Sequence, residues 1–192
     1  SRDTSGNALV INGSGKHIDF YDGTMIRREE CEYLDSIPSG NCTGFHRNGK
    51  KKEEGRYLHG KPDGLWKFWH SNGNLNKNAT YKNGELEGGF IQYFSNGKTE
   101  AAGNYLKGKK DGNWIMYREN GNKDFEGEFK EDLQHGKWMY YYSTGEKESY
   151  GLFRAGKRDS AWIFLYKTGE KWKEGSYNED FKTGKWTTWF ED

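Results

Sequence analysis

One glycine recurs every 24 residues along most of this chain, and this spacing constrains the fold more than any other feature. The series has no insertion or deletion, and its members are Gly49, Gly73, Gly97, Gly121, Gly145 and Gly169. Self-similarity at a fixed period of this size is the signature of repeat architectures, in which each unit packs mainly on its neighbours. The sequence therefore predicts a row of similar units and not a single globular core.

Five further columns share the same period. One is a tyrosine or phenylalanine column: Tyr57, Tyr81, Tyr105, Phe129, Phe153 and Tyr177. The second is rich in tryptophan: Trp66, Phe90, Trp114, Trp138, Trp162 and Trp186. The third is mixed: Trp69, Tyr93, Tyr117, Tyr141, Leu165 and Trp189. The last two columns consist of small residues. The fourth is Gly55, Ala79, Gly103, Gly127, Gly151 and Gly175, and the fifth is Gly64, Gly88, Gly112, Gly136, Ser160 and Gly184.

Each unit is expected to be a β-hairpin. No apolar i, i+3, i+4 pattern runs through any unit, so no helix is predicted. The chain has 27 Gly and only 2 Pro, a balance typical of tight turns between short strands. Two strands of about seven residues and two turns of about five fill one period. The predicted fold is all-β, an elongated array of tandem antiparallel β-hairpins with a 24-residue repeat.

The repeat pattern sets the expected domain organisation. Tyr33, Gly40, Cys42 and Phe45 each lie 24 residues before a member of a column, so a degenerate unit is expected to begin at residue 31. We expect residues 1–30 to form a lead-in and a cap strand, because terminal units of a repeat array are atypical. Residues 31–192 are then one degenerate unit followed by six regular ones.

Both faces of the second strand in each unit are apolar. Residues two apart on a strand share a face, so Trp114 and Met116 are expected on one side and Ile115 and Tyr117 on the other. A flat sheet with one dry face does not account for this pattern. We therefore predict a sheet that bends over its second strands, with glycines at the bends.

The aromatic rows are the candidate binding residues. Their first role is expected to be the core of the repeats, because aromatic residues are 17% of the chain while all hydrophobic residues are only 32%. The alternative is that rings on one face line an open groove for a peptide or a glycan. The candidate rows are Trp66, Trp69, Tyr93, Trp114, Tyr117, Trp138, Tyr141, Trp162, Trp186 and Trp189.

The repeat resembles the variant membrane occupation and recognition nexus (MORN) repeats, which include bacterial proteins labelled YwqK-like antitoxins. The resemblance covers about residues 31 to 190 and is carried best by Asn96-Gly97-Lys98, Gly103-Asn104-Tyr105 and Gly108-Lys109-Lys110-Asp111-Gly112-Asn113-Trp114-Ile115-Met116-Tyr117. It implies a row of hairpins that acts as an interaction platform. Such repeats occur in proteins of many kinds, so the resemblance does not imply a particular partner.

Motifs for chemistry are absent from the sequence. The net charge of +1 argues against nucleic acid as a partner, and no stretch approaches the ~20 apolar residues of a membrane span. His46 and His70 share a repeat phase, and we expect them to be solvated turn residues and not metal ligands. No nucleophile motif or phosphate loop occurs. We expect no catalytic residue, no metal and no cofactor.

The two cysteines and the first residue bear on the compartment. Cys31 and Cys42 lie in the phases of Gly55 and Trp66 on the two strands of the degenerate hairpin. A cross-strand disulfide and two free thiols are both open at this point. The chain starts at Ser1 and not at Met, so removal of an upstream segment is one reading, and we lean slightly towards an exported protein.

The sequence as a whole predicts a non-enzymatic scaffold or protein-interaction module that presents a repeat surface. Its expected partner is an unidentified protein, with a peptide or glycan ligand as a further option. The alternative is an antitoxin-like or immunity-like inhibitor of a toxic enzyme. This alternative rests on the family resemblance alone.

Overall fold

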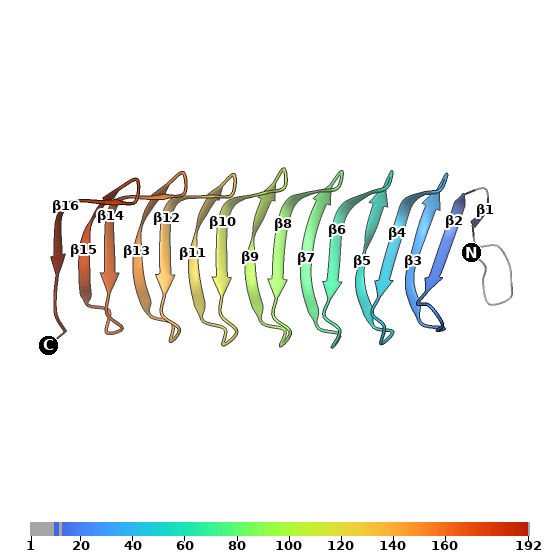
Figure 1. The fold of residues 1–192 in the computed structure, drawn as a ribbon, viewed down its shortest axis with the longest axis horizontal. Coiled ribbons are helices and arrows are strands. Elements are labelled where there is room, and N and C mark those ends of the chain that lie inside the picture. The colour runs from blue at the N-terminus through green and yellow to red at the C-terminus, as the bar shows by residue number, and fades with distance from the viewer. Residues whose placement is uncertain (1–9, 12, 192) are drawn as a thin grey trace. The chain divides into compact units, whose positions relative to one another are not determined.

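The computed structural model describes residues 10, 11 and 13–191, and the strands in this part of the chain run in sequence order with no helix between them. The chain divides into two compact units, Ser1–Gly97 (unit 1) and Lys98–Asp192 (unit 2). Figure 1 labels the strands. Those of unit 1 are β1 Val10–Ile11, β2 Ser14–Phe20, β3 Arg27–Leu34, β4 Ile37–Phe45, β5 Lys51–Leu58, β6 Lys61–Trp69, β7 Leu75–Lys82 and β8 Glu85–Tyr93. Those of unit 2 are β9 Thr99–Leu106, β10 Lys109–Tyr117, β11 Lys123–Lys130, β12 Leu133–Tyr141, β13 Lys147–Arg154, β14 Lys157–Leu165, β15 Lys171–Asn178 and β16 Phe181–Thr188.

Within each unit every strand pairs antiparallel with the next strand in the chain. The prediction of an all-β fold built from tandem antiparallel hairpins is therefore confirmed. Strand β3 runs across residues 30 and 31, between which we expect the lead-in to end and the repeats to begin. The boundary between the two compact units falls at an Asn-Gly turn, after Gly97.

Two kinds of turn alternate along the chain. The shorter has two residues with positive φ, as in Asn83 (52°) and Gly84 (89°), which is the requirement of a type I′ hairpin turn. The longer is closed by two hydrogen bonds: Tyr142 N–H donates to the Glu146 carbonyl at 2.9 Å, and Gly145 N–H donates to the Tyr142 carbonyl at 2.9 Å. Gly145 has a φ of 109°. This arrangement is the three-residue hairpin loop with a glycine bulge, so the invariant glycine of the period marks a left-handed turn position.

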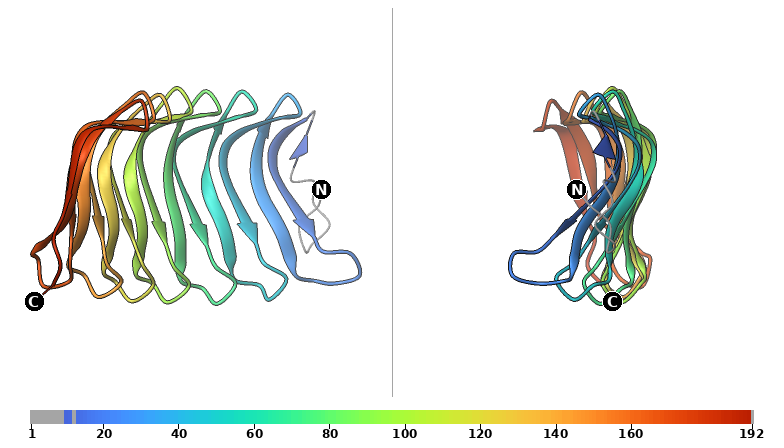
Figure 2. Two further views of the ribbon diagram at one scale, coloured as in Figure 1. Left: turned by 60° about the vertical axis from the view of Figure 1, so that its left-hand side comes forward. Right: turned by 90° about the vertical axis from the view of Figure 1, so that its right-hand side faces the viewer.

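A bulge bends each repeat in the middle of its second strand. On β11 the residues Gly127 and Glu128 are adjacent, but their partners on β12 are Trp138 and His135, so two extra residues are accommodated on β12. The first of these is Gly136, with a φ of 63°. On its other side β12 pairs with β13 without interruption through this point. The strands are visibly curved in Figure 2, in agreement with the bend that the two apolar faces predict.

The core of each repeat is a tryptophan that lies on a glycine of the preceding strand. Trp138 is 1% exposed, and a Cβ at Gly127 would overlap its indole ring. The Trp138 Nε1–H donates to the Glu128 carbonyl at 3.0 Å and to the His135 carbonyl at 3.1 Å. Both carbonyls lie at the bulge, where strand pairing is interrupted. The indole therefore fills the space above glycine and satisfies backbone oxygen atoms of the bend.

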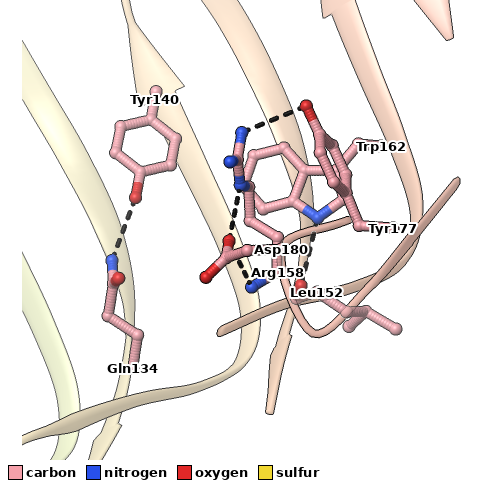
Figure 3. A network of polar contacts seen from close by, with 7 residues as sticks. All are labelled: Gln134, Tyr140, Leu152, Arg158, Trp162, Tyr177 and Asp180. Carbon is pink, nitrogen blue, oxygen red and sulfur yellow. Dashed lines mark hydrogen bonds and ion pairs between the residues drawn. The ribbon is translucent and has the colours of Figure 1, made fainter. Parts of the chain in front are cut away.

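Three other repeats use the same indole hydrogen bond, made by Trp66 to Arg56, Trp114 to Asn104 and Trp162 to Leu152. Figure 3 shows the last of these. Rings of the tyrosine column pack edge-on against the tryptophans: Phe129 lies 5.0 Å from Trp138 and Phe153 lies 5.2 Å from Trp162, between ring centroids. Edge-to-face contacts at this distance are favourable between aromatic rings. The two columns thus form one continuous core within unit 2.

The first repeat replaces the glycine–tryptophan pair by cysteines. Cys31 and Cys42 are direct partners in the β3–β4 pairing, with their Cα atoms 4.0 Å apart, and they are joined by a disulfide. Both are buried and pack with Trp66 of the next repeat. A covalent bond between the strands therefore occupies the place that an indole ring fills elsewhere.

Candidate functional site

The second strands of unit 2 present two different faces. Trp114, Trp138 and Trp162 lie on one side, which we call the tryptophan face. Because side chains alternate along a strand, Ile115 and Met139 lie on the opposite side. We call this side the groove face.

The candidate aromatic residues are divided between these two sides of their strands. Trp66, Trp114, Trp138 and Trp162 are 1–3% exposed, and Trp186 is partly buried. The five members of the other row point the opposite way, and they are Trp69, Tyr93, Tyr117, Tyr141 and Trp189. Tyr141 is 8% exposed and Trp189 is 37% exposed. The ten residues therefore do not form one surface, and a binding role for either row remains a prediction.

A shallow groove of about 970 Å³ lies on the groove face of unit 2. Its apolar part is formed by Ile115, Met139, Tyr150 and Leu165. Three lysines also line it, namely Lys137, Lys147 and Lys171. All three are exposed. The sequence pattern indicated apolar residues on this side of the strands, but it did not indicate that lysines would flank them.

A ladder of ion pairs accompanies the groove face. In four repeats a cation near the start of the first strand pairs with a glutamate three residues later, at 2.5–2.7 Å: Arg27–Glu30, Lys51–Glu54, Lys123–Glu126 and Lys171–Glu174. At Lys147 the corresponding position is Tyr150, so the acid is missing. Among the residues that the structure describes, Lys147 makes no ion pair.

Glu126 is the one acid of the groove, and its charge is already neutralised. Its carboxylate binds Lys123 and accepts a hydrogen bond of 2.5 Å from the Tyr141 hydroxyl. The hydrogen bond from Lys123, and then that from Tyr141, hold the pKa of Glu126 below its ordinary value. Burial, together with the hydrogen bond to Glu126, raises the pKa of Tyr141 to about 12. Both groups therefore keep their ordinary protonation states at neutral pH and have no free acid–base role.

The tryptophan face of unit 2 carries a polar network that serves structure. Gln134 donates to the Tyr140 hydroxyl at 2.9 Å, and Arg158 donates to Tyr177 at 3.0 Å and to Asp180 at 2.8 Å (Figure 3). The Arg158 guanidinium also lies 4.2 Å from the centre of the Tyr177 ring. Each cation and acid of this network has a partner within the network. The network therefore holds the strands together and does not contain a nucleophile paired with a base.

His46 and His70 are not solvated turn residues as expected. Their Nε2 atoms lie 2.9 Å from the Trp69 carbonyl and 3.0 Å from the Tyr93 carbonyl, and both side chains are partly buried. Each histidine thus connects its loop to the next repeat. Sequence reasoning missed this role because it noted that the two histidines share a repeat phase but assigned them to solvent-exposed turns.

The same loop position makes the same connection in unit 2 with different side chains. Arg118 donates to the Tyr141 carbonyl at 3.0 Å, and the Tyr142 hydroxyl donates to the Leu165 carbonyl at 2.7 Å. The common requirement is a side chain long enough to reach a backbone oxygen one repeat away. A search for identical residues cannot find this column, because histidine, arginine and tyrosine all meet the requirement.

The part of the chain that the structure describes holds no group of three or more His, Cys, Asp or Glu side chains suited to a metal ion. It also contains no helix of the length and apolar character needed to cross a membrane.

The comparisons with known proteins identify the repeat. No curated protein is significantly similar to the chain. The family model of the MORN repeat variant matches residues 62–83 and 110–131. The first segment contains β6 without its first residue, the long loop and β7, and the second contains β10 without its first residue, the long loop and β11. Each compact unit therefore contains one segment that matches the MORN repeat variant.

Proposed function

We propose that this chain is a non-enzymatic protein-interaction module and that the groove of unit 2 holds its partner. The observation that carries the proposal is the groove itself, an open apolar surface flanked by exposed lysines. Apolar patches rimmed by polar residues are typical of interaction sites on soluble proteins. The family of the repeats supports the same function, since MORN-variant repeats suggest an interaction or scaffold module.

The chemistry of the groove favours binding over catalysis. Glu126 is held by Lys123 and Tyr141, as described above, and the remaining titratable groups of the groove are lysines and one tyrosine. A general base or nucleophile needs a partner that activates it within hydrogen-bonding distance. The groove offers an apolar contact area and positive charge, which are the elements of recognition.

Substitution of the groove floor tests this proposal. Met139→Asp places a charge in the middle of the apolar surface, and Leu133→Asp is the matched control, because Leu133 lies outside the groove on the same strand and is 49% exposed. The purified wild type and both variants are used to capture proteins from extracts of the source cells, followed by mass spectrometry. We expect a protein that is retained by the wild type and by Leu133→Asp and lost from Met139→Asp.

Two results would contradict the proposal: equal capture by Met139→Asp and wild type, or no protein that the wild type enriches. The two variants must have the same circular dichroism spectrum as the wild type, so that loss of capture reports on the groove. The antitoxin-like alternative stays a hypothesis. It would gain support only if the captured protein were a toxic enzyme that this chain inhibits.

A further inference from the structure

We infer that the groove of unit 2 accepts an extended acidic segment of a partner protein, with acidic and apolar residues repeated every three positions, and that Lys147 pairs with one of its carboxylates. The inference rests on the proposed function, because it names the partner of the same groove. Three observations carry it: the missing glutamate three residues after Lys147, the charge of the groove lining, and the spacing between repeats.

The first observation is the interruption of the ion-pair ladder at Lys147. On either side of it, Lys123 and Lys171 are bound to Glu126 and Glu174 at 2.6 and 2.7 Å. Lys147 has the same place on its strand, opposite Tyr141 in the β12–β13 pairing. Tyr150 stands where the other rungs have their glutamate, so a carboxylate from another molecule would complete the ladder.

The second observation is the charge of the lining. The groove is lined by Lys137, Lys147 and Lys171 and by a single acid, Glu126. Lys171 pairs with Glu174, while Glu126 pairs with Lys123 and is also within electrostatic reach of Lys147. Lys137 resembles Lys147 in making no ion pair among the residues that the structure describes. Met139 lies on β12 between the levels of the two lysines, since Tyr141 pairs with Lys147. An apolar floor beside exposed cations is complementary to a segment with one apolar side and one acidic side.

The third observation is the spacing. Lys123, Lys147 and Lys171 start β11, β13 and β15, two strands apart, and Ile115 and Met139 are likewise on β10 and β12. Neighbouring strands are about 4.8 Å apart, so equivalent side chains recur about every 9.6 Å across the sheet. A polyproline II segment advances about 9.3 Å in three residues and returns to the same side. A β-strand returns to the same side after about 6.8 Å, which does not match the spacing of about 9.6 Å between equivalent side chains of the groove.

The groove is also long enough for such a segment. Its lining extends from β10 to β15, which is five strand spacings, or about 24 Å. A polyproline II segment covers this length with about eight residues. Aromatic-lined grooves suit this conformation, because the ligand is already extended before it binds. Tyr150, the residue that replaces the glutamate of the ladder, supplies such a ring beside Lys147.

The probe for this inference is a fluorescein-labelled nonapeptide, (Glu-Pro-Leu)₃, whose binding to the full chain is measured by fluorescence anisotropy. One control peptide is (Lys-Pro-Leu)₃. The second has the composition of the probe in block order, Glu₃-Pro₃-Leu₃. We expect the periodic acidic peptide to bind at least tenfold more tightly than either control, and to weaken as the salt concentration rises.

The decisive variants are Tyr150→Glu and Tyr150→Gln. Both remove the ring, but only the first adds an acid three residues after Lys147, as in the four repeats that have the ion pair. We expect Tyr150→Glu to bind the probe at least tenfold more weakly than Tyr150→Gln, because its own carboxylate occupies Lys147. Lys130→Glu, an exposed position at the end of β11 outside the groove, should bind as the wild type does.

Equal affinities of Tyr150→Glu and Tyr150→Gln, equal binding of the periodic and block peptides, or no binding of the probe would each overturn the inference. Binding of phosphatidylserine vesicles without binding of the peptide would also overturn it, in favour of a lipid surface. The capture experiment separates this failure from that of the proposed function. If Met139→Asp loses the cellular partner while the probe does not bind, the groove remains the interaction site and only its ligand class is wrong.

Discussion

The contact between Gly127 and Trp138 predicts that a single methyl group at this glycine destabilises the chain. Gly127 has an ordinary extended backbone and not a positive φ, so alanine fits its conformation. A glycine-to-alanine change within a strand is then expected to stabilise by about 0.5–1 kcal/mol. At Gly127, however, the new Cβ would overlap the Cγ, Cδ2 and Cε2 atoms of the Trp138 ring.

The size of the effect follows from the two ways in which the structure can respond. If the indole stays in place, the strain of overpacking costs about 1–3 kcal/mol. If the ring leaves, the loss of a buried tryptophan costs about 3–5 kcal/mol, and its hydrogen bonds to Glu128 and His135 are lost as well. The cheaper response is strain. The overlap involves three ring atoms, so we take the upper end of that range and subtract the backbone gain. Gly127→Ala is therefore expected to destabilise by about 2 kcal/mol.

Urea denaturation followed by circular dichroism measures this effect, with two controls. Gly89 is exposed and extended, and no atom lies within 4 Å of a Cβ placed there, so Gly89→Ala should be neutral or slightly stabilising. In a Trp138→Ala background the overlap no longer exists, and Gly127→Ala should then stabilise by about 0.5–1 kcal/mol. If Gly127→Ala is as stable as the wild type, or if its cost persists without the indole, the reasoning is refuted.

Three further predictions concern stability. Replacement of Cys31 and Cys42 by serine should cost about 3 kcal/mol, and titration of the unfolded, unreduced protein should find no thiol, whereas two reactive thiols would contradict the disulfide. In the folded chain the pKa of Tyr141 is raised from 10.0 to about 12. The protonated hydroxyl therefore contributes its full share to the free energy of unfolding below pH 10, and this contribution is lost as the pH rises from about 10 to about 12. Between pH 9 and about pH 11.5 the urea midpoint should therefore fall less in Tyr141→Phe than in the wild type. An equal fall in the two proteins would contradict this. The Nε1 of Trp186 is buried without a hydrogen-bond partner, whereas that of Trp138 has one. Substitution of tryptophan by phenylalanine should therefore lower the free energy of unfolding by about 1 kcal/mol more at Trp138 than at Trp186. Equal losses at the two positions would argue against the indole hydrogen bond.

The fold could be derived from the sequence because its period is unbroken. The glycine column fixed the turns, and the Trp114–Tyr117 alternation indicated two apolar faces and a bend. The bulge itself could not be placed, because the small-residue column that includes Gly136 indicates a bend but does not show that Gly136 and Lys137 both lack a partner on the preceding strand. Only the pairing shows that they are unmatched on one side.

The site was less accessible to sequence reasoning. The candidate aromatic residues were chosen by type, which combined two rows on opposite sides of their strands. The groove depends on residues that vary between repeats, such as Met139 and Lys147. A signal for it did exist in the sequence: Glu30, Glu54, Glu126 and Glu174 share a phase that also holds Asn78, Ala102 and Tyr150, and of these three only Tyr150 has a lysine, Lys147, three residues before it. The significance of Tyr150 in this phase becomes clear only when the structure shows that the glutamates of the phase form ion pairs.

The most direct test of the central claim is a methyl NMR titration of the full chain with its captured partner or with the acidic nonapeptide. The assigned methyl groups of Ile115 and Met139 report on the groove, and those of Leu133 and Leu106 report on exposed positions outside it. An interaction module that works through the groove should show saturable shifts at Ile115 and Met139 and none at the two leucines. Shifts confined to the leucines, or none at the groove at saturating ligand, would contradict the account.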